Sequence, residues 1–70
     1  MKISIDFEGN LRGRPKYDVI ETEHRFQLGE KLDYCNDQGT KYYGIVDDIE
    51  LHHDAQLNKE ELFLTIKLDD

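Results

Sequence analysis

The chain has 70 residues, of which 37% are hydrophobic, and its formal net charge is −7. A chain of this length, taken as one domain over residues 1–70, is near the lower limit at which a single core holds a fold together, so little apolar surface remains for an active-site cleft. The single cysteine excludes an internal disulfide, and no apolar stretch is long enough for a signal peptide or a membrane span. We therefore expect a cytoplasmic protein without membrane contact.

Alternation of apolar and polar residues predicts an all-β chain of five strands. The segment 9–16 holds two glycines and the only proline, so it is expected to form a loop. The segment 52–61 fits a long loop, an extended hairpin or one short helical turn. The strands are expected at residues 1–8, 17–20, 26–34, 41–51 and 62–68.

Two glycines fall inside these expected strands. Gly29 interrupts the alternation of residues 26–34, which indicates a bulge or a tight bend where a barrel strand turns its corner. Gly44 lets a neighbouring backbone or side chain approach closely. The core is expected to contain the inward-facing apolar side chains of the strands. These are Ile3, Ile5, Phe7, Phe26, Leu28, Leu32, Ile45 or Val46, Ile49, Leu64 and Ile66.

The stretch from Phe26 to Glu50 resembles the first hairpin of the Tudor and related SH3-like barrels. Those domains open with an aromatic, an apolar residue and Gly-Asp/Glu, pass through a short acidic turn, and resume with an aromatic, a small residue and an alternating Ile/Val pair. The resemblance implies a five-stranded, antiparallel SH3-like barrel. The matching residues are Phe26, Leu28, Gly29, Glu30, Leu32, Tyr42, Gly44, Val46 and Ile49.

The same resemblance implies a binding role. In Tudor domains, aromatic side chains at the barrel mouth form a cage for methylated Arg or Lys through cation–π attraction. Tyr42 matches a cage position, whereas Cys35 and Asn36 stand where another aromatic is expected. Prokaryotic and phage proteins use the same barrel for head–tail assembly and as small adaptors, so the resemblance also implies an assembly role of phage or mobile-element type.

Two adjacent tyrosines are the strongest candidates for an interaction surface. Tyr42 and Tyr43 must face opposite sides of their strand, so they cannot both enter the core. The outward one is either an interface anchor or a surface tyrosine packed on a neighbouring strand. Together with Asp47 and Asp48, this tyrosine leads us to expect a non-catalytic protein-interaction or assembly module that binds a basic protein partner or pairs edge to edge with a second copy.

A short basic segment supports a different hypothesis. Arg12-Gly-Arg-Pro-Lys16 matches the core of the AT-hook, whose extended arginines enter the narrow, negative minor groove of A·T-rich DNA. Minor-groove binding through Arg12, Arg14 and Lys16 is therefore the alternative to a solvated loop. Residues 1–16 carry four basic and two acidic side chains, whereas the remaining 54 carry five basic and fourteen acidic ones. Such a surface repels phosphate elsewhere, and it fits a third hypothesis, an acidic inhibitor that mimics DNA to occupy a basic nucleic-acid-binding protein.

The sequence carries no pattern typical of catalysis, a cofactor or a metal. His52 and His53 are adjacent, so on a strand they point to opposite faces and do not share one ion. Cys35 has no base assigned to it by the sequence and fits a small apolar filler at a strand end. We expect no enzyme activity, because no paired nucleophile and base, phosphate loop or metal spacing is visible.

Overall fold

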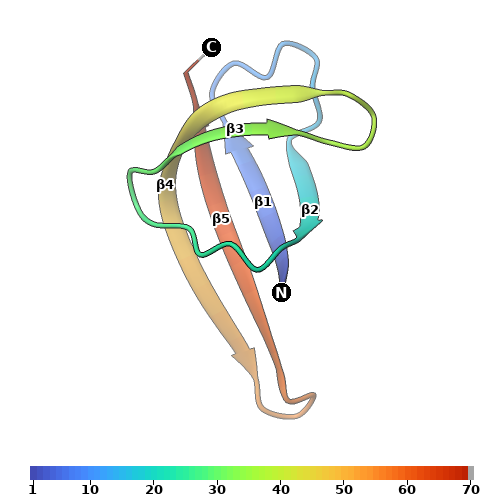
Figure 1. Cartoon of the computed structure of the whole chain (residues 1–70). Coiled ribbons are helices and arrows are strands. Elements are labelled where there is room, and N and C mark those ends of the chain that lie inside the picture. Colours follow the sequence, from blue (N-terminus) through green and yellow to red (C-terminus); the bar gives the residue numbers. More distant parts are fainter. Residues whose placement is uncertain (70) are drawn as a thin grey trace.

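The computed structural model describes residues 1–69 and consists of five β-strands in one curled sheet (Figure 1). The sheet has the order β2-β1-β5-β4-β3 and forms a half-barrel, with no helix in the described residues. The all-β prediction is therefore confirmed. The strands are β1 (Lys2–Glu8), β2 (Tyr17–Glu21), β3 (Lys31–Cys35), β4 (Lys41–Asp54) and β5 (Lys59–Leu68).

The sheet is mixed rather than antiparallel. Strand β1 runs parallel to β5, with Ile3 beside Leu62 and Phe7 beside Ile66, while the other three pairs are antiparallel. The expectation of an antiparallel barrel is wrong at this pair. Parallel pairing joins the two ends of the chain across a long connection, and no local turn signal in the sequence specifies it.

An extended hairpin, not a helical turn, occupies the segment 52–61. Pairing between β4 and β5 continues to Asp54 opposite Lys59, and residues 55–58 form the turn. The Asp54 carboxylate accepts the N–H groups of Gln56 and Leu57 at 3.0 and 3.3 Å, which fixes the start of this turn. In Figure 1 the hairpin projects beyond the rest of the sheet as an arm.

Strand β3 begins later than expected because residues 27–30 form a tight turn. The Glu30 N–H donates to the Gln27 carbonyl at 3.1 Å, and Gly29 has a φ of 82°, so the predicted bend at Gly29 is confirmed. The Gly29 N–H donates to the Val46 carbonyl at 2.8 Å, which holds the turn against β4. Leu28 lies at the tip of the turn and is 67% exposed, so its predicted place in the core is wrong. The turn at residues 27–30 ends the strand, so the alternation of apolar and polar residues in β3 does not extend back to Leu28.

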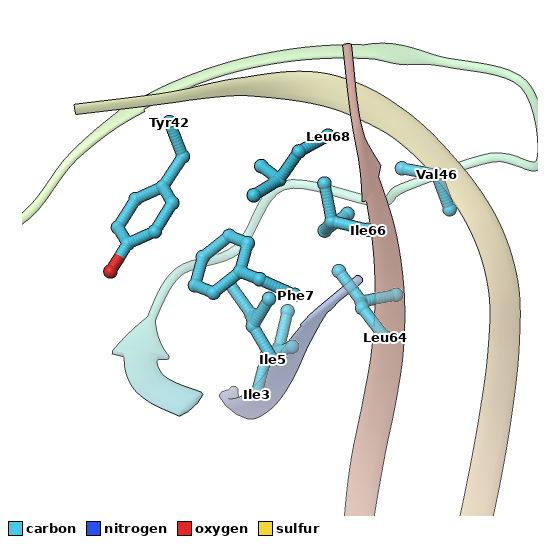
Figure 2. Packing of buried hydrophobic residues seen from close by; sticks show 8 residues of the cluster. All are labelled: Ile3, Ile5, Phe7, Tyr42, Val46, Leu64, Ile66 and Leu68. Carbon is cyan, nitrogen blue, oxygen red and sulfur yellow. The ribbon is translucent and has the colours of Figure 1, made fainter. Parts of the chain in front are cut away.

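The core lies on the concave face of the half-barrel (Figure 2). The rings of Phe7 and Tyr42 stack with their centres 3.8 Å apart, and Leu64 and Ile66 of β5 pack beside the β1 side chains. Partly buried Phe26, Leu32 and Ile49 complete the core at its margin. The buried side chains are Ile3, Ile5, Phe7, Tyr42, Val46, Leu64, Ile66 and Leu68.

A bulge in β4 changes which residues face the core. The register shifts between Val46 and Asp48, so Asp47 is an extra residue that has no partner on β5. Before the shift the even-numbered residues of β4 face inward, whereas after it Ile49 pairs with inward-facing Leu64. Of the alternative Ile45 or Val46, the structure selects Val46 for the core.

We expect Gly44→Ala to destabilise the fold by about 1–3 kcal/mol, as overpacking does in a close-packed interior. A Cβ at Gly44 would overlap the carbonyl oxygen of Lys67 and would lie 2.9 Å from Cγ2 of Ile66, so β4 and β5 would have to separate. Urea unfolding followed by circular dichroism measures the loss. The control is Ile45→Ala on the convex face, and equal losses in the two variants would contradict the close approach at Gly44.

Candidate functional site

A cleft of about 760 Å³ lies on the open side of the half-barrel. One wall is formed by β2, and the other by residues 34–38 at the end of β3 and in the following turn. Strands β2 and β3 are the two edges of the sheet, so the cleft marks the place where the barrel does not close. Figure 1 shows β2 on the same side of the molecule as the tip of the β3–β4 hairpin.

Strand β2 turns an unpaired backbone edge toward this cleft. Just outside the strand, the Phe7 N–H donates to the Lys16 carbonyl at 2.8 Å, and the Thr22 N–H donates to the Met1 carbonyl at 3.0 Å. Bonded and non-bonded pairs alternate in an antiparallel ladder, so the even-numbered residues of β2 bond to β1 and the odd-numbered ones point their backbone groups away from the sheet. The residues with outward backbone groups are Tyr17, Val19 and Glu21.

Asp18 connects the two edges of the sheet across the cleft. Its Oδ1 accepts the N–H of Val19 at 2.8 Å, and its Oδ2 accepts the hydroxyl of Tyr34, on β3, at 2.7 Å. The first bond satisfies one outward donor of β2 with a carboxylate, in the way that an added strand would satisfy it with a carbonyl. The second bond ties β2 to β3 through side chains alone.

The opposite wall is shaped by the turn after β3. The Asn36 side-chain oxygen accepts the N–H groups of Gln38 and Thr40, each at 2.9 Å, and the Asn36 N–H donates to the Thr40 carbonyl at 2.9 Å. An asparagine that bonds the backbone two residues ahead is a common way to fix a turn. This turn holds Asp37 at the rim of the cleft.

The cleft is acidic. Asp18, Glu21 and Asp37 contribute carboxylates to its lining, and none of the described residues that line it is Lys or Arg. Closely spaced carboxylates create a negative potential that attracts a positively charged ligand and repels phosphate. The electrostatics of the cleft therefore favour a basic occupant.

Burial and hydrogen bonding keep the cleft phenol neutral. The pKa of Tyr34 is raised above its usual value, first because burial disfavours the phenolate and then because the hydrogen bond to Asp18 and the charge of that carboxylate favour the phenol. Burial also raises the pKa of Tyr42. Tyr34 therefore acts as a hydrogen-bond donor to Asp18 throughout the neutral range.

The basic loop does not present its three cations together. Arg12 lies at the tip of a turn with a φ of 52°, next to Gly13 with a φ of 78°, so the segment is turned rather than extended. Lys16 leaves the loop toward the convex face, where its Nζ lies 4.0 Å from Asp6 Oδ1.

Arg14 is bonded to the backbone of its own loop and of β4. Its Nε donates to the Leu11 carbonyl at 2.7 Å, its Nη1 to the Lys41 carbonyl at 2.8 Å, and its Nη2 to the Asn10 carbonyl at 3.0 Å. The guanidinium carbon also lies 5.1 Å from the ring centre of Tyr42. Entry of Arg14 into a minor groove would require breaking these bonds.

Of the predicted protein-binding residues, the structure separates the two tyrosines as expected. Tyr42 faces inward, is 0% exposed and donates its hydroxyl hydrogen to the Pro15 carbonyl at 2.8 Å, so of the two candidates Tyr42 belongs to the core and Tyr43 is the outward tyrosine. Tyr43 is 40% exposed on the convex face. Asp47 and Asp48 are exposed at the bulge farther along β4, separated from Tyr43 by residues 44–46. Their role in binding stays a prediction.

The histidines and the cysteine do not converge on one site. Among residues 1–69, no three His, Cys, Asp or Glu side chains are placed to hold a metal ion. Cys35 is exposed, with its thiol 3.6 Å from the Asn36 carbonyl, so the expected packing of this side chain at a strand end is wrong. Each histidine lies beside a different glutamate. The pairs are His24 with Glu30 at 2.7 Å, His52 with Glu50 at 3.2 Å and His53 with Glu60 at 3.9 Å.

Comparison with known proteins gives no match for this chain among protein-family models, curated proteins or solved structures. Within the described part of the chain, no helix is long and apolar enough to cross a membrane. Sequence reasoning missed Asp18 as a site residue. The available signal was an acid at position 18, in phase with apolar Ile20 on the inward face of an expected strand.

We expect Arg14→Ala to lower the free energy of unfolding by about 1.5–3 kcal/mol, the range for hydrogen bonds to charged groups. The substitution removes three bonds to carbonyls and uncovers the ring of Tyr42. The control, Arg12→Ala in the same loop, should change stability by less than about 0.5 kcal/mol, as surface substitutions do. Denaturant unfolding compares the two variants, and a stability loss no larger for Arg14→Ala than for Arg12→Ala would contradict the structural role of Arg14.

Stability should fall above about pH 10, the ordinary pKa of tyrosine, because the unfolded chain releases the Tyr34 proton there while the folded chain keeps it. The stabilisation is fully present below that pH and is lost as the pH approaches the raised folded value. Tyr34→Phe should flatten this fall and reduce stability at neutral pH by about 1 kcal/mol, the loss expected for one hydrogen bond. Unfolding free energies measured across this range test both effects. The control Tyr17→Phe should keep the fall, and an unchanged slope in Tyr34→Phe would refute the assignment.

Proposed function

We propose that this chain is a non-catalytic protein-interaction module that binds an extended, basic segment of a partner protein along β2. The observation that carries the proposal is the acidic cleft beside an unpaired sheet edge. Strand addition of this kind draws affinity from main-chain hydrogen bonds and specificity from pockets for alternate side chains. The outward backbone groups of Tyr17 and Glu21 would make those bonds, and the Val19 N–H would join them by exchanging the Asp18 carboxylate for a carbonyl of the added strand.

The half-barrel supports this function through its shape. A strand added to β2 would lie between the two edges of the sheet and would extend the curl toward closure. The half-barrel is compatible with a small barrel fold, and the SH3-like resemblance of residues 26–50 implies a small adaptor or assembly protein. Strand addition is one mechanism by which such a protein binds its partner. That finer assignment forms part of the proposal.

Charge favours a basic protein segment over DNA and over a second copy of the chain. Phosphates would meet Asp18, Glu21 and Asp37 in the cleft, and Arg14 is engaged by three carbonyls. Two copies paired through β2 would bring their own carboxylates together, which destabilises cross-strand contact. A basic nucleic-acid-binding protein, the target expected for a DNA mimic, falls within the class of partner proposed here.

The probe for this proposal is an acetylated and amidated peptide of alternating lysine and valine, titrated into the labelled protein and followed by amide NMR. We expect the largest shifts at Tyr17, Val19 and Glu21, with affinity falling as salt rises. A peptide of alternating glutamate and valine should bind more weakly, because the cleft repels it.

Proline substitution distinguishes the β2 edge from the other edge. Val19→Pro removes an outward N–H, together with its bond to the Asp18 carboxylate, without removing a bond to β1, so it should abolish the peptide-induced shifts. Asp33→Pro removes the corresponding outward N–H of β3 and should leave them intact. Shifts that survive Val19→Pro, or that appear at β3 rather than β2, would overturn the proposal.

A further inference from the structure

A second hollow, of about 450 Å³, lies on the convex face of the sheet, behind the strand edge that lines the cleft. It crosses four strands, because the register aligns Val19, Ser4, Phe63 and Glu50 in one row. The small side chain of Ser4 leaves room between Val19 and Phe63. The lining of the hollow therefore combines apolar Val19 and Phe63 with polar side chains, among them Asp6, Glu50 and His52.

The next row of the same face carries an unsatisfied carboxylate. The register aligns Tyr17, Asp6, Thr65 and Asp48. Asp6 Oδ1 is covered by its surroundings, and no hydrogen bond from the described residues 1–69 reaches it. A covered carboxylate oxygen without a donor is costly, so this atom is a position where a ligand's N–H group would be stabilised.

A cation already lies close to this position. The Nζ of Lys16 is 4.0 Å from Asp6 Oδ1 and 5.6 Å from the ring centre of Tyr17. The ammonium is too distant to donate a hydrogen bond to the carboxylate, and both side chains are more than a third exposed, so the pair is weak. Lys16 thus marks a cation position between an aromatic ring and a carboxylate, and another donor can displace it.

We propose that this hollow selects a lysine or arginine of the bound segment, at the residue that pairs with Tyr17. This inference rests on the proposed strand addition at β2. The side chain of that residue would lie on the convex face, two strand spacings of about 4.8 Å each from Asp6. An extended lysine or arginine spans most of this distance across the ring of Tyr17, and its head then meets the Asp6 carboxylate.

The chemistry of the hollow fits a long cationic side chain better than a short or neutral one. Tyr17 offers an aromatic face for cation–π contact, and the apolar stem would pass beside Val19. Glu50, at the far side of the hollow, adds a second negative charge. A neutral apolar residue could not donate a hydrogen bond, so it would leave the Asp6 carboxylate oxygen without a donor.

The decisive comparison is between two aspartates of the convex face, Asp6 and Asp33, titrated with the lysine–valine peptide. Asp6→Asn should raise the dissociation constant about tenfold, the size expected for one lost charge-assisted hydrogen bond. Asp33→Asn removes the same charge from the convex face of β3 and should raise it less than about twofold. Substituting norleucine for the lysine that pairs with Tyr17 should weaken binding to the wild type but not further weaken binding to Asp6→Asn.

Removing the resident cation provides a measurement in the opposite direction. Lys16→Ala should tighten peptide binding, because it vacates the position beside Asp6, and it should do so more than Lys67→Ala, which removes a charge elsewhere on the convex face. Retained shifts at β2 with unchanged affinity in Asp6→Asn would overturn this inference and leave strand addition standing. Equal weakening by Asp33→Asn would also overturn it, in favour of a diffuse acidic surface. Absence of shifts at β2 in the wild type would overturn the proposed function itself.

Discussion

One sheet has to supply both the core and the surface of this protein, and the rest of the structure depends on that constraint. No helix in residues 1–69 covers either face, so the apolar side chains are buried only because the sheet curls around them. The parallel pairing of β1 with β5 makes this possible, since it places the first and last strands side by side at the centre of the sheet. Ile5 from one end of the chain and Leu64 from the other then become neighbours in one core.

The curl of the sheet is produced at two positions in β4 and at the turn before β3, and the cleft is the gap that remains between the two edges of the curled sheet. Gly44 admits the backbone of Lys67, the bulge at Asp47 bends the strand, and the turn at Gly29 returns the chain to Val46. These features bring β3 over the core but not into backbone pairing with β2. Within residues 1–69, the two edges are joined only where side chains reach across, so the least complete part of the barrel is also the part with exposed hydrogen-bonding groups.

Local patterns in the sequence predicted the elements better than their partners. Alternation and glycine identified the strands and the bend, because both signals are contained within a few residues. These signals failed where contacts are non-local. The prediction for Leu28 assumed that alternation continues through a bend, where it in fact ends, and Leu28 is exposed. The parallel pairing of β1 with β5 could not be predicted, because no short turn in the sequence joins the two strands. The candidate site was less predictable for the same reason. Asp18 and Tyr34 meet only because the sheet curls, and Arg14 finds its third carbonyl on β4.

The acidic charge of the chain connects the stability of the free protein with the partner proposed for it. An exposed sheet edge is a template for pairing with any other strand, including the same strand of another copy. Asp18 satisfies one outward donor of β2 within the chain, and the carboxylates of Glu21 and Asp37 make the approach of a second acidic chain unfavourable. The same charges lower the energy of a basic strand at that edge. The carboxylates that prevent self-pairing are therefore also those that would select the partner, because both outcomes follow from the sign of the charge around a single unpaired strand.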